Sequence, residues 1–495
     1  MITVVGTGTG APLPPDAEEA LGGAGLVVGA RRHLDRAALP DTASRIVLGP
    51  LAPALDAIER YLEKAETAAE AQAAAETPPQ TGTATATAAA AAAAGSAATA
   101  DRTNPAAWAA GQGRVVVLAS GDPGFFGIVR ALAERFGAGR LDVRPGVSSV
   151  ATAFARAGLT WDDAVVVSAH GRDLRTAVNV CRAHPKVAVL TGPGSGPAEL
   201  GAALRSGDRM LVVASALGSG SGASAGTGSG AGTGTGASAG SGAGEGSGSG
   251  SASGSGERVE RVTPAEAAVR DWGQAVNVVL CLDESRLLSP ARTIAGPAPT
   301  PSRWALAESE FAHRDSMITK FEVRALALAR LGPRLGDHVW DIGAGSGSVA
   351  VECARLGAAV TAVEKTRDGV ERVRANAAAH GVDVTAVHGA APTVLSDLPD
   401  PDAVFVGGGG RELPAIVTAC ARRARRSVVV AMAALDRVPA VRDALVLAGL
   451  DCEGVLLQSS RLAPLPGDVT RLAATNPVFL LWGVRPPAHS EGVTQ

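Results

Sequence analysis

Short apolar runs rich in valine alternate along the chain with longer stretches that carry apolar residues at helical spacing. Helical stretches of this kind include GIVRALAERFG at 127–137 and AVNVCRAH at 177–184. Such alternation is typical of α/β folds with mainly parallel sheets. In the N-terminal part, strands are predicted at 2–6, 26–30, 114–120, 140–146, 164–169, 186–192, 209–215 and 276–282.

The C-terminal part repeats this rhythm more regularly. Helical patterns fill the intervals between the first six predicted strands, including RDGVERVRANAAAHG at 367–381. No helix is evident between the sixth and seventh strands, which favours a seventh strand that runs antiparallel to the others. We therefore predict a Rossmann-like sheet of seven strands, at 338–343, 359–364, 383–389, 402–408, 427–432, 453–459 and 477–483.

Two low-complexity tracts interrupt the alternation. One at about 65–105 is rich in Ala, Thr and Glu, and one at 217–256 consists almost entirely of Gly, Ser, Ala and Thr. Neither buries enough side chain to offset the entropy of ordering, so both are expected to be mobile insertions. A proline-rich stretch at 289–303 marks a junction between domains. The predicted organisation is a first domain at 1–288, a linker at 289–312 and a second domain at 313–495.

The composition narrows the class of protein. The chain has 495 residues, of which 46% are hydrophobic, and this suits two or three domains with sizeable cores. A net charge of −3 argues against non-specific binding of nucleic acid. The five cysteines include no CxxC pair, which indicates reduced thiols. The N-terminus has no signal-peptide pattern and the polyalanine run is too short to span a bilayer, so we expect a cytoplasmic protein without a membrane partner.

A glycine-rich turn, DIGAGSGSV at 341–349, lies between a predicted strand and a predicted helix. The dinucleotide fingerprint GxGxxG would need glycine at 348, where this chain has Ser348. Glu364 ends the next strand, where an acid can accept hydrogen bonds from both ribose hydroxyls. Asp341 and the amides of 344–347 would then face the amino-acid end of S-adenosylmethionine. This pattern favours a methyltransferase over a dehydrogenase, with cofactor contacts from Asp341, Gly343, Ala344, Gly345, Ser346, Gly347 and Glu364.

The fourth predicted strand of this sheet ends in FVGGGG at 405–410. Enzymes that methylate exocyclic amino groups commonly carry an Asn/Asp-Pro-Pro-aromatic motif at this point, which is absent here. The polyglycine, including Gly407, suits close approach of a bulky flat substrate or simply a tight loop, and the sequence leaves both open.

A different turn, LASGDPGFFG at 118–127, follows a valine-rich strand in the first domain. Asp122, Pro123 and Gly124 predict a tight turn, and no GK[ST] follows, so the motif is not a P-loop. Comparable loops end other strands: GTGTG at 6–10, PGVSSV at 145–150, SAHGRD at 168–173 and TGPGSGPAEL at 191–200.

This set of loops resembles the tetrapyrrole methylase family, whose members bind S-adenosylmethionine in a cleft between two α/β subdomains. The string at 145–173 looks like the C-5 methylases of the cobalamin pathway. The segments at 318–356 and 389–410, with the ending NPVFLL, look like the decarboxylating C-15 methylase of the same pathway. Departures are Thr9 in place of the usual proline, and Ala390 in place of the acidic residue of the usual Gly-Asp/Glu-Ala-Pro.

The resemblance implies that the first domain methylates C-5 of precorrin-6Y. The second domain would methylate C-15 and release CO2 from the ring-C acetate, giving precorrin-8X. It also implies one S-adenosylmethionine per domain, no metal, and a homo-oligomer. The other cofactor contacts that it implies are Gly6, Gly8, Ser120, Gly121, Asp122, Gly124, Ser148, Ser149 and Thr191 in the first domain, and Thr319, Ala390, Ala391 and Gly407 in the second.

A polycarboxylate substrate requires cationic partners. Candidates are Arg31 and Arg32 in GARRHLD, Arg172 in HGRD, and Lys320 and Arg324 in TKFEVR; each is equally consistent with a solvated surface charge. His170, in a loop beside glycine, is a candidate to orient the substrate or to transfer a proton.

Other functions fit parts of the sequence. One is a sirohaem-type fusion of a tetrapyrrole methylase with an NAD-dependent dehydrogenase, against which Ser348 argues. Another is a non-catalytic cofactor-binding scaffold. A third, a generic small-molecule or RNA methyltransferase, leaves the separate loops of the first domain unexplained.

Overall fold

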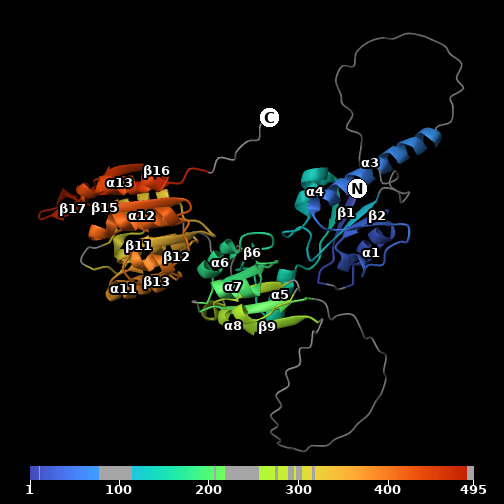
Figure 1. Ribbon diagram of the computed structural model, residues 1–495, viewed down its shortest axis with the longest axis horizontal. Helices are drawn as coiled ribbons and strands as arrows, with labels where there is room; N and C mark the ends of the chain where they lie inside the picture. Colours follow the sequence, from blue (N-terminus) through green and yellow to red (C-terminus); the bar gives the residue numbers. More distant parts are fainter. Residues whose placement is uncertain are drawn as a thin grey trace, which may run out of the picture. The chain divides into compact units, whose positions relative to one another are not determined.

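Helices and strands alternate along most of the described chain in the computed structural model, and the predicted α/β class is confirmed (Figure 1). Two compact units are present: Met1–Gly158 with Ala214–Val259, and Leu159–Val213 with Glu260–Gln495. The predicted domain boundaries stay predictions, because much of the linker at 289–312 lies outside the described residues. The structure describes residues 1–9, 12–76, 114–205, 208–217, 256–273, 277–287, 295–296, 304–314 and 318–487.

The first unit is built on a five-stranded parallel sheet in the order β3-β2-β4-β1-β5. Alternate strand residues enter two separate cores, as the period of two in a strand requires. Val4 packs on the face covered by α3 and α4, and Val5 packs on the face covered by α1 and α2. The elements are β1 Ile2–Gly6, α1 Pro15–Gly22, β2 Leu26–Gly29, α2 Arg31–Leu34, β3 Ser44–Val47, α3 Leu51–Glu76, β4 Val115–Ala119, α4 Val129–Phe136, β5 Leu141–Arg144 and α5 Ser149–Ala157.

Helix α3 corrects one expectation. It continues to Glu76 and so covers the start of the tract at 65–105 that was expected to be mobile. Alanine and glutamate are strong helix formers, so a segment that begins on a buried face extends readily beyond it. The rest of both predicted insertions, apart from their end residues 217 and 256, lies outside the described residues.

The second unit contains a five-stranded sheet in the order β6-β7-β10-β8-β9. β6 and β7 are parallel, whereas β10 is antiparallel to β7. Helices α6, α7 and α8 accompany this sheet (Figure 1). The elements are β6 Val165–Ser168, α6 Leu174–Ala183, β7 Lys186–Leu190, α7 Pro197–Ala203, β8 Met210–Ser215, β9 Arg258–Val262, α8 Pro264–Val269 and β10 Asn277–Leu282.

A seven-stranded sheet follows, in the order β13-β12-β11-β14-β15-β19-β16. The first five strands of this order are parallel, and β19 is antiparallel to both β15 and β16, as predicted for the seventh strand. The elements are α9 Phe321–Leu331, β11 His338–Ile342, α10 Ser348–Arg355, β12 Ala359–Glu364, α11 Arg367–Ala379, β13 Thr385–His388, β14 Ala403–Val406, α12 Leu413–Arg423, β15 Ser427–Met432, α13 Val438–Leu447, β16 Asp451–Leu457 and β19 Val478–Val484.

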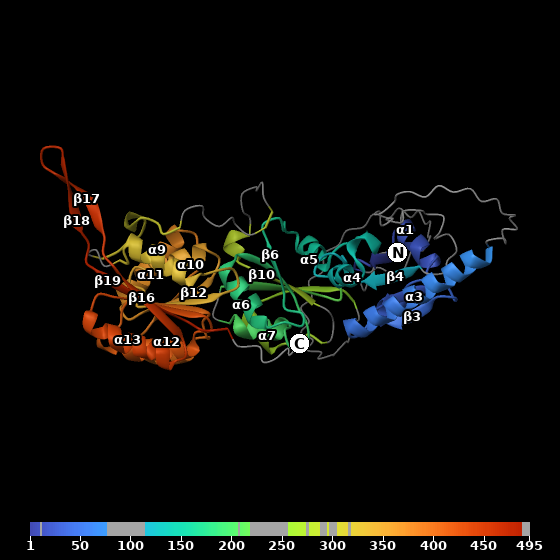
Figure 2. The same cartoon turned by 90° about the horizontal axis from the view of Figure 1, so that it is seen from above.

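Along the chain, β16 and β19 are separated by an antiparallel hairpin of β17 Ser460–Leu465 and β18 Val469–Ala474. Figure 2 shows it beyond the edge of the seven-stranded sheet. The sequence predicted no strands here. Leu462 and Leu472 pair across the hairpin and are 78% and 68% exposed.

Candidate functional site

Three loops of the first unit meet at the carboxyl end of its sheet, at positions where only glycine fits. A Cβ on Gly6 would lie 2.5 Å from the backbone nitrogen of Gly146 and 2.7 Å from the carbonyl oxygen of Gly121. A Cβ on Gly146 would lie 2.6 Å from the carbonyl oxygen of Gly121 and 2.8 Å from that of Gly6. The ends of β1, β4 and β5 therefore approach through backbone alone, and any side chain at these glycines would separate them.

Gly8 and Gly121 join two of these loops directly. They form an antiparallel bridge in which each backbone N–H donates to the other's carbonyl, at 3.3 and 3.0 Å. Both have positive φ, +54° and +61°, which L side chains rarely adopt. The two glycine-rich motifs, more than a hundred residues apart in sequence, thus form one structure, as expected if both contact the same ligand.

The predicted turn at Asp122 is present. The Asp122 carboxylate accepts a hydrogen bond from the backbone N–H of Gly124 at 2.8 Å, as in an Asx turn. Ser148 caps α5, since its hydroxyl accepts from the N–H of Ala151 at 3.1 Å, and Ser149 begins the helix. The Cα of Ser148 lies 3.6 Å from an ideal Cβ on Gly121, so the helix N-terminus borders the bridge between the loops.

A polar cluster on the same edge of the sheet joins the predicted Arg32 and Ser120 to two residues that sequence reasoning missed, His33 and Thr7. His33 of α2 contacts the hydroxyl of Thr7 through Nδ1 at 3.2 Å and the hydroxyl of Ser120 through Nε2 at 2.8 Å. Arg32 donates to the Ser120 hydroxyl at 2.6 Å. Burial, aided by the charges of Arg32 and Arg36, lowers the pKa of His33 to about 4. The only sequence signal was the string RRHLD, in which the arginines alone had been singled out.

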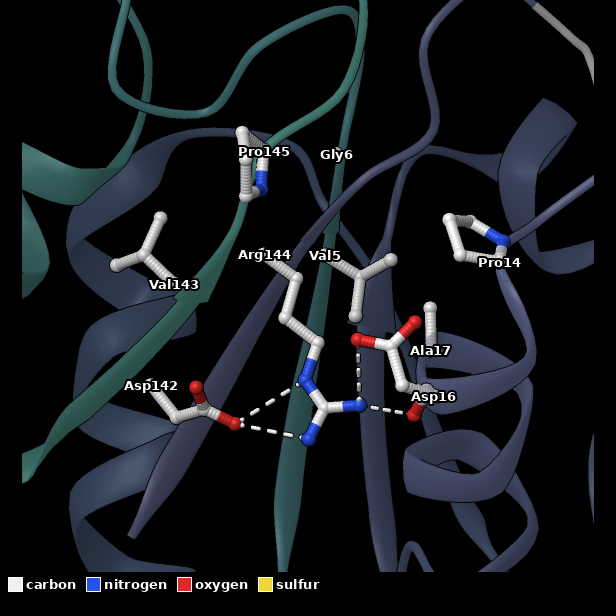
Figure 3. A pocket seen from close by; sticks show the side chains of 9 residues that line it. All are labelled: Val5, Gly6, Pro14, Asp16, Ala17, Asp142, Val143, Arg144 and Pro145. Atoms are coloured by element: carbon white, nitrogen blue, oxygen red, sulfur yellow. Dashed lines mark hydrogen bonds and ion pairs between the residues drawn. The ribbon is translucent and has the colours of Figure 1, made fainter.

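A cavity of about 440 Å³ opens beside Gly6, between the ends of β1 and β5 and the start of α1 (Figure 3). The side chain of Arg144 forms part of the cavity wall. The guanidinium donates to Asp142 at 3.0 and 3.1 Å and lies 3.4 Å from the carboxylate of Asp16. Two carboxylates around one guanidinium leave this wall with a net negative charge, so it is a poor receptor for a carboxylate.

The second unit holds the remaining residues predicted for the first site. Thr191 is buried and its hydroxyl donates to the carbonyl of Asn277 at 2.6 Å. Its own carbonyl accepts from Nδ1 of His170 at 3.2 Å, which orients that ring. Arg172 is exposed in the same loop. His170 and Arg172 therefore lie together at the end of β6, and their predicted catalytic roles stay predictions.

The GxGxG turn between β11 and α10 requires its glycines. Gly343, Gly345 and Gly347 all have positive φ, at +72°, +57° and +71°. A Cβ on Gly347, which caps α10, would lie 3.0 Å from a methyl carbon of Val373. The turn carries Ala344 and Ser346 between the glycines and presents backbone amides at the start of a helix, where a polar ligand binds favourably.

Two carboxyl groups flank this turn. Glu364 accepts from the backbone N–H of Gly345 at 3.0 Å through one oxygen and from the N–H and hydroxyl of Thr366, both at 2.9 Å, through the other. Asp341 is buried and accepts from the N–H of Ala350 at 2.9 Å. Burial raises the pKa of Asp341 to about 7; the Ala350 hydrogen bond opposes this shift, and nearby Glu364 adds to it. The predicted acids thus hold the turn in place from both sides.

The polyglycine after β14 packs against the same turn. An ideal Cβ on Gly343 would lie 3.1 Å from the backbone nitrogen of Gly408, and one on Gly407 would lie 2.9 Å from the ring of Phe405. The tight-loop interpretation of this motif is therefore confirmed, while close approach of a substrate stays a prediction. Ala390 is exposed and Ala391 is partly buried in the loop after β13, on the far side of β12 from β11.

Arg324 lies inside the domain. Its guanidinium is 0% exposed, donates to the carbonyl of Thr319 at 2.7 Å and to that of Leu306, and lies 3.7 Å from the buried Glu352. This geometry favours a structural role, holding the segment before α9, over the predicted contact with a substrate carboxylate. Lys320 precedes α9 and is partly exposed.

Within the described ranges, no group of three or more His, Cys, Asp or Glu side chains is arranged to hold a metal ion. The five cysteines are all described and free, and Cys452 is the one that is only partly buried. No helix among the described residues is both long and apolar enough to cross a membrane.

Two family models match the chain. Residues 1–220 match the model of tetrapyrrole (corrin/porphyrin) methylases, and residues 309–481 match that of the precorrin methyltransferase domain. The first match includes the loops around Gly8 and Gly121, and the second includes the GxGxG turn. The two matches coincide with the two sets of glycine turns.

Curated relatives are similar to the chain over different extents. A precorrin-6Y C(5,15)-methyltransferase [decarboxylating] from a Sinorhizobium species is 34% identical over 60% of this chain, and one from Mycobacterium tuberculosis is 33% identical over 61%. The chain covers 63% and 66% of these two proteins, less than two thirds of their length. A probable cobalt-precorrin-6B C(15)-methyltransferase (decarboxylating) from Pyrobaculum calidifontis is 39% identical over 33% of this chain and 87% of its own length.

Proposed function

The chain belongs to the precorrin methyltransferase family, and from this premise we propose that it methylates precorrin-6Y at C-5 and C-15 and decarboxylates the ring-C acetate, giving precorrin-8X. The observation that carries the proposal is the presence of two separate glycine-turn sites, each within the range of a different methyltransferase family model. Relatives named C(5,15)-methyltransferases support the pairing of the two activities in one chain. The dehydrogenase alternative is not supported, because Ser348 breaks the dinucleotide fingerprint and these relatives are methyltransferases.

In the second domain, the residues around the turn fit S-adenosylmethionine. This donor supplies an electrophilic methyl group on a positively charged sulfur. Glu364 is fixed by three hydrogen bonds at the end of β12, where an acid can accept from ribose hydroxyls. The amides of the turn suit the amino-acid end of the donor, and the buried Asp341 supports the turn through Ala350. Positioning of the two reactants supplies most of the rate enhancement for such a displacement.

Decarboxylation needs no further protein group with special chemistry. The macrocycle is an extended π system that accepts the electron pair left when CO2 departs. Removing water from the acetate in an apolar pocket promotes this loss. We therefore propose that the second domain contributes binding and exclusion of water to this step, together with the methyl transfer to C-15.

In the first domain, the proposed donor site comprises the joined loops at Gly8 and Gly121, the Asp122 turn and the N-terminus of α5. The family resemblance also implies Thr191, His170 and Arg172, which belong to the second unit. Arg31, Arg32 and Arg172 are proposed to pair with substrate carboxylates. We propose one S-adenosylmethionine per domain and a cytoplasmic location.

We also propose a homo-oligomer. The hairpin β17–β18 supports this, since it exposes leucines on both strands. Light scattering after size-exclusion chromatography would give a mass of at least two chains. Replacing Leu462 and Leu472 by serine should shift that mass toward one chain, and a monomeric wild-type protein would refute the proposal.

The direct test of the reaction is mass spectrometry of the tetrapyrrole after incubation with precorrin-6Y and S-adenosylmethionine carrying a labelled methyl group. We expect two labelled methyl groups in the product and the loss of one CO2. A product with a single methyl group, or turnover that depends on a nicotinamide nucleotide, would contradict the proposal.

A further inference from the structure

The hydrogen bonds around His33 determine which of its nitrogens carries the proton. The hydroxyl of Thr7 donates its single hydrogen to the carbonyl of Ala119 at 2.9 Å. It can therefore only accept from His33, so Nδ1 of the ring bears hydrogen and Nε2 of the neutral ring has a free electron pair. The hydroxyl of Ser120, 2.8 Å away, then donates to Nε2. This is the arrangement of a hydroxyl, a base and a group that orients the base.

The same geometry places the hydroxyl of Ser120 at the proposed donor site. Ser120 is exposed at the end of β4, directly before Gly121, which is bridged to Gly8. Arg32 donates to its oxygen at 2.6 Å, which holds the hydroxyl in position and favours negative charge on that oxygen. His33 itself is partly buried behind it. A proton taken up at Ser120 therefore has a short path to Nε2 of His33.

His33 is neutral at physiological pH and able to accept a proton. Its pKa is lowered to about 4, mainly by partial burial and to a smaller extent by the nearby charges of Arg32 and Arg36. The groups that contact its ring from the residues directly after β1 and β4 are the uncharged hydroxyls of Thr7 and Ser120. Carboxylates of a bound substrate that pair with Arg32 and Arg36 would cancel part of their effect and raise the pKa of His33. Binding of the substrate would thus strengthen the base.

The proposed reaction needs such a group. Methyl transfer from a sulfonium to a neutral carbon makes the macrocycle a cation, and neutrality returns only when a proton leaves. C-5 is a bridging carbon that bears one hydrogen, so the proton leaves from the carbon that has just been methylated. A cationic macrocycle is a strong acid, so a base with a low pKa suffices.

We propose that His33, acting through Ser120, accepts the proton released from C-5 during the first-domain methylation. The carbon–sulfur bond breaks with its electron pair left on sulfur, and a π pair of the macrocycle forms the new bond from C-5 to the methyl carbon. The C-5–hydrogen bond then breaks and returns its pair to the π system. The proton passes to Ser120 as the serine's own proton passes to Nε2. The inference rests on the proposed function and adds to it a proton acceptor.

The test uses the full chain with precorrin-6Y, in which the second domain serves as an internal control. In His33→Gln we expect methylation at C-5 to slow by about a hundredfold, the typical contribution of a general base, while methylation at C-15 and loss of CO2 continue. Ser120→Ala should slow C-5 methylation in the same way. His313→Gln, an exposed histidine in the other unit, should leave both reactions unchanged.

Three readouts separate proton transfer from a merely structural role. First, the rate of methylation at C-5 by the wild type should decrease at acidic pH, and the rate of His33→Gln should not show this pH dependence. Second, deuterium at C-5 should slow His33→Gln more than the wild type, because proton removal becomes rate-limiting. Third, the NMR-monitored pKa of His33 should rise when the methylated product is added.

The outcomes are distinguishable. Wild-type protein that adds no methyl at C-5 would refute the proposed function itself. Wild-type protein that adds both methyls, with His33→Gln and Ser120→Ala each within twofold of its rate at C-5, would overturn the proton relay alone. If His33→Gln also loses the C-15 reaction, circular dichroism shows whether the variant is folded, and Ser120→Ala then decides.

Discussion

At the second site, the glycine turn is fixed by its backbone conformation and by hydrogen bonds to it. Gly343, Gly345 and Gly347 adopt backbone angles that other residues rarely adopt, and Glu364 fixes the turn that they form. Asp341 is held beneath this turn with its pKa raised to about 7 by burial. Substitutions here should therefore change stability and ligand binding together.

Asp341 makes stability depend on pH. Its pKa is about 7 in the folded state and 3.8 as the ordinary value, so the folded state binds more protons between these limits. Asp341 therefore stabilises the folded state fully below pH 3.8, and this stabilisation is lost as the pH rises through 7. We expect Asp341→Asn to remove this decline, which urea unfolding monitored by tryptophan emission at pH 5 and pH 8 would detect. An identical pH dependence in wild type and variant would contradict the assignment.

Gly347→Ala should be costly for two reasons. Its φ of +71° strains any L residue, and the new Cβ would lie 3.0 Å from Val373. We expect a loss of roughly 1–3 kcal/mol in the free energy of unfolding. Gly381→Ala is the matched control, because its φ is +64° but nothing lies within 4 Å of its Cβ. Chemical denaturation should show the larger loss for Gly347→Ala; equal losses would mean that the Val373 contact is unimportant.

Among the elements, the predicted strands agree with the observed ones to within about two residues, because the buried parallel strands are unbroken apolar runs. Four strands were missed, because their sequences are largely exposed and lack that signal: β3, β9, β17 and β18. The glycine turns were found because backbone geometry demands glycine. His33 was missed because its contacts, to residues 26 and 87 positions away, arise only in the folded chain.

An ion-pair cluster links the hairpin to α9 and to the segment before it. Arg461 of β17 contacts Glu308 at 2.7 and 2.8 Å and Glu322 at 2.7 and 3.1 Å. Hydrogen bonding to Arg461 is the main reason that the pKa of Glu308 falls to about 2. The ordinary pKa of a glutamate is 4.5. The cluster therefore stabilises the fold fully above pH 4.5, and this stabilisation decreases as the pH falls toward 2.

Arg461→Leu should remove this acid-sensitive contribution. Because the side chains are partly exposed, we expect a loss of roughly 1 kcal/mol at pH 7 and a much smaller one near pH 3. Arg471→Leu, at an exposed position on the neighbouring strand β18, provides the control and should cost little at either pH. Thermal denaturation at the two pH values would test this; a loss of equal size at both would contradict the ionic origin.

At the scale of the whole molecule, we propose that one chain contains two independent sites for the same methyl donor. The structure places one group of glycine turns in the first unit and the other in the seven-stranded sheet of the second. The two sets of turns belong to different sheets, which explains why the two glycine motifs have unrelated spacing. The sequence predicted each set of turns.

Calorimetric titration of the full chain with S-adenosylhomocysteine, the demethylated donor, tests this claim most directly. We predict that the wild-type chain binds two molecules and that Gly345→Val binds one. Gly345 has a positive φ, which disfavours the branched side chain of valine at this position. A single molecule bound by the wild type, or loss of all binding in Gly345→Val, would contradict the existence of two separate sites.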